Sequence, residues 1–226
     1  RRGDLRDASA VAASMQGVTH VLHLGALGSV PRSVEDPATS NDVNANGTLN
    51  VLVAARDAGA KRLVFSSSSS VYGANPEIPK RVGMLTDPVS PYAVTKQAAE
   101  SYTRVFHRVY GLETVALRYF NVFGENQRPD SAYAAVIPRF MAAALAGEAL
   151  EIHGDGLQSR DFTYVDNVVS ANILAATVAG VEGEVFNIAC GGCYTLLDIA
   201  DALEKALGKP IARRHVPART GDVRKS

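Results

Sequence analysis

Short apolar runs rich in β-branched residues alternate with longer helical patterns through the first half of this chain. This alternation predicts a parallel sheet wound with helices on both faces, an α/β fold. Right-handed crossovers would place the loops that follow the strands along one edge of the sheet, where ligands bind. The expected strands are residues 18–24, 62–65 and 114–119, and the expected helices are residues 39–58 and 91–109.

Beyond residue 122 this rhythm gives way to segments rich in Gly, Pro and Asn. We expect a partial α/β domain over residues 1–122 and a smaller, irregular α/β lobe over residues 123–226, with some segments returning to the first domain. Thr195 and Asp198 predict a capping box at the start of a helix that Gly208 ends. The shorter strands expected in the lobe are residues 149–153, 162–165 and 184–188.

Composition excludes several classes of partner. With 46% hydrophobic residues, a chain of 226 residues can bury a full core. Its 23 basic residues balance its 23 acidic ones, so no field of either sign would attract nucleic acid or an anionic membrane. No apolar run reaches the roughly 18 residues that a membrane span needs, and the first residues lack the apolar stretch of a signal peptide. We therefore expect a cytoplasmic protein.

The two cysteines, Cys190 and Cys193, flank two glycines. A redox centre with this spacing opens a helix after a strand, whereas Thr195 caps the helix expected here. The pattern therefore favours a Gly-rich turn in a reducing compartment. The five histidines show no ligand spacing with the cysteines, so we predict no metal site.

No glycine-rich loop of the form G-x-x-G-x-x-G or G-x-G-x-x-G occurs between a strand and a helix, so no dinucleotide pyrophosphate site is visible. Residues 3–5 resemble the end of an earlier strand, and residues 222–226 stop without a closing element. We interpret the sequence as a fragment whose first βαβ unit lies upstream and whose end is truncated.

Tyr92 and Lys96 place a phenol and an ammonium group one helical turn apart on the same face. Tyrosine has an ordinary pKa of about 10, and a neighbouring cation lowers that pKa by favouring the phenolate. The serines at 66–70 directly follow the preceding strand, so they would meet this pair at the carboxyl edge of the sheet. Each feature alone commonly has a structural role. Together they predict proton removal from an alcohol while hydride leaves its carbon, with Ser68 bound to the same oxygen.

Seven short motifs occur in order along the chain. They are Asp4-Leu5, residues 23–26, residues 44–48, the serines before residues 71–73, Tyr92-x-x-x-Lys96, residues 117–124 and residues 160–162. In this order they resemble the extended short-chain dehydrogenase/reductase family of NAD-dependent epimerases and dehydratases. The resemblance runs the whole length of the chain. It implies a Rossmann-like first domain that binds NAD and a sugar-nucleotide substrate held mainly by the second lobe.

The resemblance also implies roles for individual residues. Tyr92 would be the base, Lys96 would hold the nicotinamide ribose while tuning Tyr92, and Ser68 would be the catalytic serine. Further NAD contacts would come from Asp4, Leu5, Leu24, Gly25, Ala26, Asn44, Ser66, Tyr119 and Val122. Substrate contacts would come from Ser29, Ser69, Ser70, Asn121, Ala135, Val136, Arg160, Arg219, Asp222 and Ser226. Because the family's pyrophosphate loop has no counterpart here, cofactor binding by this chain alone stays open.

The reaction follows from what surrounds the catalytic serine. Dehydratases and many decarboxylases of the family carry an acidic residue just after it, whereas Ser69 and Ser70 follow Ser68 here. Return of the hydride to the other face of a rotated 4-keto sugar, an epimerisation, is then the simplest outcome. Residues 27–33 and 133–138 resemble the branch of the family that prefers N-acetylated UDP-hexosamines. In the family, one residue bounds the pocket for the group on C2 of the sugar, and the resemblance puts Ser226 at that position. A residue as small as serine leaves room for the acetamide. We expect interconversion of UDP-N-acetylglucosamine and UDP-N-acetylgalactosamine.

Two alternatives stay open. The enzyme could be a UDP-glucose 4-epimerase or a UDP-uronic acid epimerase or decarboxylase. A non-catalytic dinucleotide-binding scaffold is the other class, although such proteins usually lose the tyrosine or the lysine. The residue that separates NAD from NADP would lie upstream of the first residue, and the pathway is open, although polysaccharide synthesis fits the substrate.

The helices expected near residues 40–58 and 92–110 carry more apolar surface than one sheet needs. This surplus predicts a homodimer through a four-helix bundle.

Overall fold

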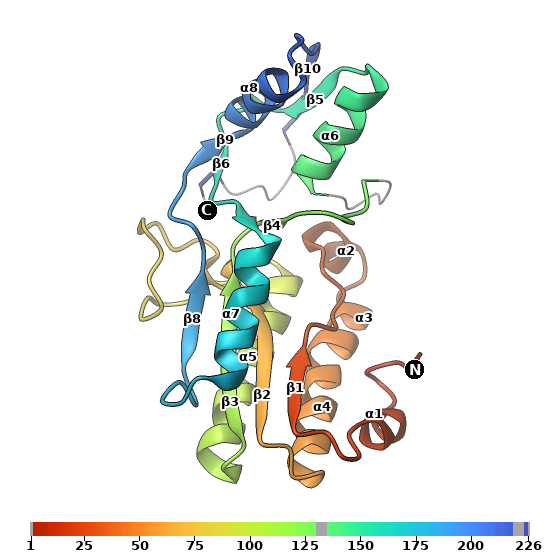
Figure 1. Cartoon of the computed structure of the whole chain (residues 1–226), viewed down its shortest axis with the longest axis vertical. Helices are drawn as coiled ribbons and strands as arrows, with labels where there is room; N and C mark the ends of the chain where they lie inside the picture. The colour runs from red at the N-terminus through yellow and green to blue at the C-terminus, as the bar shows by residue number, and fades with distance from the viewer. Residues whose placement is uncertain (1, 130–134, 219–223, 226) are drawn as a thin grey trace. The chain divides into compact units, whose positions relative to one another are not determined.

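The computed structural model describes residues 2–129, 135–218, 224 and 225, and its contacts divide the chain into two units. The first unit comprises Arg1–Tyr119 and Asp166–Ile188, and the second comprises Phe120–Val165 and Ala189–Ser226. The chain therefore passes between the units three times (Figure 1). The domain boundary that the sequence predicts at residue 122 stays a prediction. The segment 166–188 lies in the first unit.

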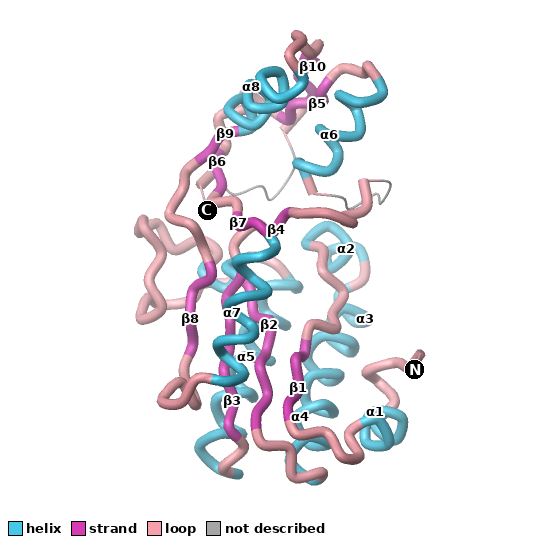
Figure 2. Tube along the Cα trace, in the orientation of Figure 1, coloured by secondary structure: helices cyan, strands magenta, loops and turns pink. Residues whose placement is uncertain are grey.

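A four-stranded parallel sheet forms the centre of the first unit (Figure 2). Its strands are β1 (His20–His23), β2 (Arg62–Ser68), β3 (Glu113–Tyr119) and β8 (Val185–Ile188), in the order β1-β2-β3-β8. All three pairings are parallel. The α/β fold class expected from the sequence is confirmed. Within the described residues, β1 and β8 are the edge strands of this sheet.

Helices cover both faces of this sheet (Figure 1). On one face Phe65 and Ala116 pack with Ala99 of α5, and on the other Val64 packs with Ala175 of α7. Because alternate strand residues point to opposite faces, α5 and α7 must lie on different sides. The helices of this unit are α1 (Ala8–Ser14), α2 (Val30–Glu35), α3 (Pro37–Asn41), α4 (Gly47–Asp57), α5 (Pro91–Tyr110) and α7 (Val165–Thr177).

The helix expected over residues 39–58 is interrupted by a π-helical turn at Asp42–Asn46, which joins α3 to α4. Asn44 lies in this turn and is buried. Its Oδ1 accepts a hydrogen bond from the Leu27 N–H at 2.7 Å, and its Nδ2 donates to Thr95 Oγ1 at 3.2 Å. Asn44 thus joins the loop after β1 to α5.

Strand β2 is longer than the sequence predicted, because three of the serines belong to it. The expected strand ended at residue 65, whereas β2 continues to Ser68 and a 3-10 turn follows at Ser69–Tyr72. Ser66, Ser67 and Ser68 pair in register with Leu117, Arg118 and Tyr119 of β3. Serines do not favour a strand by themselves, and here the hydrogen bonds to the backbone of β3 make these three residues part of one.

The second unit contains α6 (Val136–Ala146) and α8 (Leu196–Leu207), which share a core with β5 (Leu150–His153). Strand β5 pairs in parallel with β10 (Arg213–Val216). The expected capping box of Thr195 and Asp198 begins α8, and Gly208 ends it with a φ of +65°. The remaining ladders join β4 (Val122–Phe123) to β7 (Thr163–Tyr164) and β6 (Ser159–Arg160) to β9 (Tyr194–Thr195).

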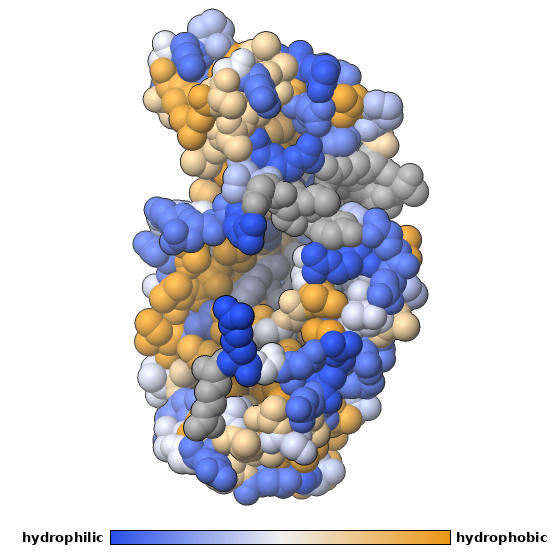
Figure 3. Space-filling view, turned by 90° about the vertical axis from the view of Figure 1, so that its right-hand side faces the viewer, coloured by the Kyte–Doolittle hydropathy of each residue, from blue (hydrophilic) through white to orange (hydrophobic). Residues whose placement is uncertain are grey.

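Several large apolar side chains of the first unit are exposed, among them Leu24 after β1 and Ile173 and Leu174 on α7. Figure 3 shows hydrophobic side chains gathered in orange areas on one face. Among the residues that the structure describes, no helix has the length and apolar character needed to cross a bilayer. The same residues contain no group of three or more potential metal ligands.

Candidate active site

The first turn of α5 is fixed by serines from two directions. The Ser90 side chain caps the helix by accepting a hydrogen bond from the Ala93 N–H at 3.2 Å. The Tyr92 N–H donates to Ser33 Oγ of α2 at 3.0 Å, and Ser33 Oγ donates to the Val30 carbonyl at 2.7 Å. Both contacts hold the backbone of Tyr92 in place.

The side chain of Tyr92 lies beside Ser68 at the end of β2. Burial raises the pKa of Tyr92, and a hydrogen bond with the Ser68 side chain lowers it by a smaller amount. The net direction is upward. The lowering expected from the sequence involved the charge of an oxidised nicotinamide as well as that of Lys96, and it stays a prediction. Burial disfavours the phenolate, and a further positive charge is needed to reverse that effect.

Ser68 is also bound by the 3-10 turn that follows it. The N–H and the hydroxyl group of Ser70 both donate to Ser68 Oγ, at 3.2 and 2.9 Å. With its oxygen accepting two bonds, Ser68 keeps its own proton for donation toward Tyr92 or a ligand. Ser69 and Ser70 are half-buried in this turn.

Lys96 lies one helical turn after Tyr92 and is only 5% exposed. Its Nζ donates to the carbonyl oxygen of Ser66 at 2.7 Å and lies 5.0 Å from the centre of the Phe65 ring and 6.0 Å from that of Tyr92. Burial lowers the pKa of Lys96 to about 8. The serine strand and the Tyr-x-x-x-Lys helix thus lie together at one end of the sheet.

Tyr119 and Asn172 form a second hydroxyl cluster with Ser66. The Tyr119 hydroxyl lies 3.0 Å from Ser66 Oγ and accepts a hydrogen bond from Asn172 Nδ2 at 2.7 Å. Burial raises the pKa of Tyr119. Sequence reasoning missed Asn172, although a buried amide between Val168 and Ala175 on the apolar side of α7 was a signal for it.

His23, the last residue of β1, is buried. Its Nε2 lies 2.9 Å from Thr48 Oγ1, and Thr48 Oγ1 donates its proton to the Asn44 carbonyl at 2.6 Å. Because the threonine hydroxyl has one proton, His23 Nε2 must carry the hydrogen of the neutral ring. Burial, and secondly the charge of Lys96, lowers the pKa of His23 to about 4.

The residues expected around the adenine and ribose lie near the start of the chain. The Asp4 carboxylate is paired with Arg6 at 2.6 Å, which lowers the pKa of Asp4 to about 2. Leu5 packs against Gly25 and Gly47, where an added Cβ would lie 3.0 and 2.8 Å from Leu5 atoms. Glycine at residue 25 therefore allows the loop after β1 to approach Leu5 closely.

Other expected ligand residues have structural roles of their own. Leu24 is 57% exposed after β1, and Ala26 is half-buried. The Ser29 side chain caps α2 by accepting a hydrogen bond from the Arg32 N–H at 3.2 Å. Val122 is half-buried in β4 of the second unit.

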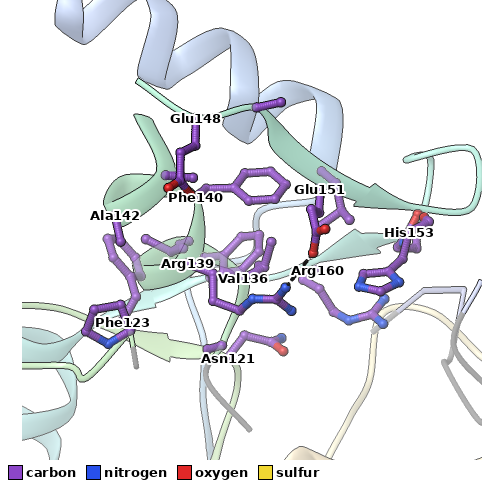
Figure 4. A pocket seen from close by; sticks show the side chains of 18 of the residues that line it. Asn121, Phe123, Val136, Arg139, Phe140, Ala142, Glu148, Glu151, His153 and Arg160 are labelled. Atoms are coloured by element: carbon purple, nitrogen blue, oxygen red, sulfur yellow. Dashed lines mark hydrogen bonds and ion pairs between the residues drawn. The ribbon is translucent and has the colours of Figure 1, made fainter. Parts of the chain in front are cut away.

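The second unit holds a pocket of about 800 Å³. Asn121, Ala135, Val136 and Arg160 line it, together with Arg139. Figure 4 shows Arg139 reaching toward Glu151, to which it is paired at 3.1 Å, with Asn121 and Arg160 nearby in that view. The charged groups of the lining are three arginines, the third being Arg214, and two glutamates, Glu148 and Glu151. Arg139 and Arg214 both pair with Glu151, so Arg160 and the Asn121 amide are the donors that best suit an anionic ligand with a ring system.

Asn121 turns the chain sharply at the edge of this pocket. Its φ is +30°, a value that asparagine adopts more readily than most residues. Its Nδ2 donates to the Asp161 carbonyl at 2.9 Å, and Arg160 Nη1 donates to the Ser159 carbonyl at 2.9 Å. The expected ligand residues Arg219, Asp222 and Ser226 lie outside the described residues.

The structure thus brings the predicted residues together in two sets. The first unit holds Ser66, Ser68, Tyr92, Lys96 and Tyr119 around the carboxyl ends of β2 and β3. The second unit holds Asn121, Ala135, Val136 and Arg160 around its own pocket.

The model of the NAD dependent epimerase/dehydratase family matches residues 1–189. The chain belongs to this family. The membership expected from the sequence motifs, within the extended short-chain dehydrogenase/reductases, is confirmed. This NAD-dependent epimerase/dehydratase chain shares its parallel-sheet fold with solved structures of UDP-sugar epimerases.

This epimerase/dehydratase chain is similar to several named UDP-sugar 4-epimerases. The UDP-glucose 4-epimerase of Mycolicibacterium smegmatis is 39% identical over 91% of the chain and 66% of its own length. The UDP-glucuronate 4-epimerase of Thermodesulfobacterium geofontis is 36% identical over 92% of the chain and 62% of its own length. A solved UDP-N-acetylglucosamine 4-epimerase from Methanobrevibacter ruminantium M1, in complex with UDP-N-acetylmuramic acid, is 42% identical, with a TM-score of 0.95 over 100% of the chain and 72% of its own. The chain spans between 61% and 66% of the length of the first four curated relatives.

Proposed function

We propose that this protein is a UDP-sugar 4-epimerase that uses NAD. The observation that carries the proposal is the arrangement of Tyr92, Ser68 and Lys96. Two hydroxyl groups that share a hydrogen bond and a buried ammonium group lie at the carboxyl end of a central parallel strand. This arrangement suits the removal of a proton from a sugar hydroxyl.

The donors around Lys96 fit a nicotinamide nucleoside. Within the described residues, Lys96 Nζ donates to Ser66 O, and an ammonium group has three N–H donors. The remaining donors can bind the hydroxyl groups of a ribose. NAD, when bound, supplies a hydride acceptor and, in its oxidised form, a positive charge. The NAD contacts proposed from the sequence at Asp4, Leu5, Leu24, Gly25, Ala26, Asn44, Ser66, Tyr119 and Val122 remain part of this proposal.

In the proposed reaction, Tyr92 accepts the proton of the C4 hydroxyl group while the C4 hydride is transferred. Ser68 donates a hydrogen bond to the same oxygen and stabilises the charge that develops on it. Lys96 favours the phenolate of Tyr92 by its charge. After the 4-keto sugar rotates, Tyr92 returns its proton to the oxygen as hydride returns to the opposite face of C4. No atom is lost or gained by the sugar.

Epimerisation is favoured over dehydration because no acid follows the catalytic serine. The positions after Ser68 are Ser69 and Ser70, and Ser70 binds Ser68 itself. Glu100, a buried acid of the adjacent helix, is occupied by Arg118. Removal of a C5 proton or of a leaving group would require a further acid or base.

We propose the pocket of the second unit as the site for the UDP portion, with Asn121 and Arg160 donating to the diphosphate. UDP-N-acetylglucosamine and UDP-N-acetylgalactosamine are the first choice of substrates. The likeness of residues 27–33 to that branch supports this choice. So does the 42% identity to the solved UDP-N-acetylglucosamine 4-epimerase, against 36% to a solved UDP-glucose 4-epimerase with the same TM-score of 0.95. UDP-glucose and UDP-glucuronate are the alternatives, because the curated relatives include 4-epimerases of both.

The test is to incubate the protein with NAD and one UDP-sugar at a time and to follow the anomeric proton signals by NMR. We expect the galacto isomer to appear, and to appear faster from UDP-N-acetylglucosamine than from UDP-glucose. Faster conversion of UDP-glucose or UDP-glucuronate would overturn the choice of substrate. Conversion of none of them, with NAD shown to be bound, would favour the scaffold alternative.

We also propose a homodimer. Val94, Tyr102, Val105 and Val109 of α5 are between 42% and 66% exposed, a row of apolar side chains that a partner helix would cover. Light scattering that gives the mass of a monomer would contradict this proposal. The cytoplasmic location and a role in polysaccharide synthesis stay predictions, which cell fractionation and a gene deletion would check.

A further inference from the structure

Glu100 extends the row formed by Tyr92 and Lys96, because these three residues are spaced four apart on α5. Each reaches a different one of three consecutive serines in β2. Tyr92 binds the Ser68 side chain, Lys96 Nζ donates to the Ser66 carbonyl at 2.7 Å, and Glu100 Oε2 accepts from Ser67 Oγ at 2.7 Å. The same helical face therefore presents a base, a cation and a carboxylate to one strand.

Both oxygens of Glu100 are bound by one guanidinium group. Arg118 Nε donates to Oε2 at 2.9 Å and Nη2 donates to Oε1 at 2.6 Å, and each residue is only 5% exposed. Arg118 Nη1 also donates to the Tyr72 hydroxyl at 2.8 Å, and that hydroxyl donates to Asn187 Oδ1 at 2.7 Å. Arg118 is thus held by Glu100 on one side and by the Tyr72 hydroxyl on the other. Its two parallel N–H bonds to Glu100 are the bidentate arrangement that a guanidinium group forms with a carboxylate.

This arrangement matters because a carboxylate four residues from a lysine on a helix is close enough to pair with it, although the pair is weaker when the lysine comes first, as here. Here Lys96 forms no ion pair within the described part of the chain. If Glu100 turned to Lys96, the ammonium charge would be neutralised, and Tyr92 would lose the cation that favours its phenolate. We propose that Arg118 is a positioning residue that keeps Glu100 away from Lys96 and so leaves Lys96 an uncompensated cation beside Tyr92. This inference rests on the proposed roles of Tyr92 and Lys96.

Few other charged groups surround Lys96. His23 approaches it from β1 as a neutral ring, and Tyr92 and Glu100 lie on its own helix. Strand β3 contributes Arg118 behind Glu100. The elements packed against the head of α5 add Arg32 and Glu35 of α2, and Asp42 of the π-helical turn. Burial is the cause that lowers the pKa of Lys96.

The test measures the pKa of Lys96 directly, by NMR of labelled lysine side chains, with its signal assigned through Lys96→Arg. Arg118→Met frees Glu100, and we expect the pKa of Lys96 to rise by about one unit or more. In the double variant Arg118→Met with Glu100→Gln, no carboxylate is present, and the pKa should stay near that of the unmodified protein. A higher pKa of Lys96 in the double variant would overturn the inference. So would an unchanged pKa of Lys96 in the single variant, where Glu100 would have taken up a proton instead.

Arg62→Met is the matched control, because Arg62 is an equally buried arginine on the neighbouring strand and pairs with Glu113 and Glu182 instead. It should leave the pKa of Lys96 unchanged. If Arg118→Met does not fold, Arg118→Lys keeps the charge but loses the fork, and a smaller rise is expected. No rise in that variant would also count against the inference.

The titration needs no substrate, so it separates this inference from the proposed reaction. If the pKa of Lys96 moves as expected but no UDP-sugar is converted, the proposed function fails alone. If conversion occurs, the acidic limb of its pH profile should move to higher pH in Arg118→Met and return in the double variant. At a fixed pH on that limb, the activity of Arg118→Met should be roughly tenfold lower for each pH unit of the shift. An unmoved limb would show that Arg118 has only a structural role.

Discussion

Lys96 donates its 2.7 Å hydrogen bond to the main-chain carbonyl oxygen of Ser66, not to a side chain. Ser66 pairs with Leu117 in the register of β2 and β3, so the position of the ammonium group is set by the sheet itself. A side-chain substitution at Ser66 leaves that acceptor in place. The geometry of Lys96 is therefore as rigid as the central ladder of the first unit.

Replacing Lys96 with Met should abolish activity and yet raise stability. The folded pKa of about 8 lies below the ordinary 10.5, so the folded state disfavours the ammonium form. This cost is largest below pH 8 and disappears as the pH rises to 10.5, and it amounts to at most about 3 kcal/mol. Denaturant unfolding at neutral pH should show a higher free energy of unfolding for Lys96→Met. A loss of stability at every pH would contradict the prediction.

Tyr92→Phe should lower the rate of UDP-sugar conversion by about a hundredfold to ten-thousandfold, because the base is lost while the ring stays. The measurement is the anomeric NMR assay. Tyr110→Phe is the control, since Tyr110 is an exposed tyrosine at the other end of the same helix and outside the proposed dimer row. Equal rates for Tyr92→Phe and the unmodified protein would refute the assignment of Tyr92 as the base.

His23 should make the protein less stable as the pH falls from about 6.5 to about 4. Its folded pKa of about 4 lies below the ordinary 6.5, so in this window the unfolded state binds the proton more tightly. The loss is up to about 3 kcal/mol. Unfolding measured across this range should show a shallower pH slope for His23→Gln. His20→Gln, which removes an exposed histidine, is the comparison variant.

Gly73→Ala should destabilise the protein by about 3 kcal/mol or more. Gly73 has a φ of +46°, and a Cβ there would lie 1.8 Å from the backbone oxygen of Asp87. Gly111→Ala is the matched comparison, because Gly111 also has a positive φ of +70° but open space around it. That change should cost about 1–2 kcal/mol. Similar losses for the two variants would show that the close approach at Asp87 is unimportant.

Arg160→Met should raise KM for the UDP-sugar by about tenfold to a hundredfold and leave kcat nearly unchanged, because a diphosphate contact stabilises substrate and transition state alike. Initial rates over a range of substrate concentrations measure both constants. Arg213→Met is the control, since Arg213 pairs with Asp201 and Glu204 and does not line the pocket. A fall in kcat with constant KM would place Arg160 at the reacting carbon instead.

The sequence predicted the sheet and its long helices because their apolar periodicity is local. The strand near 114–119 and the helix near 91–109 differ from β3 and α5 by only one residue at an end. The end of β2 was missed because Ser66 to Ser68 become strand residues only by pairing with β3, which is distant in sequence. The π-helical turn around Asn44 was missed for a similar reason, since its side chain binds Leu27 and Thr95.

For the candidate site, the sequence predicted that the serine run and the Tyr92-x-x-x-Lys96 pair would meet, and they do. It could not predict the direction of the pKa of Tyr92, because that depends on how deeply the phenol is buried. Nor could it find Asn172 or the pairing of Glu100 with Arg118, since these are contacts between elements that share no local motif.

The three passages of the chain between its units have a consequence for protein engineering. The second unit is built from two separate stretches, 120–165 and 189–226, with the segment 166–188 of the first unit between them. A single crossover with a relative near residue 165 would therefore exchange about half of the pocket-bearing unit together with α7 and β8 of the first unit. To transplant the whole pocket-bearing unit from a relative, both stretches must be exchanged at once, with the joins placed at Tyr119, Asp166 and Ile188.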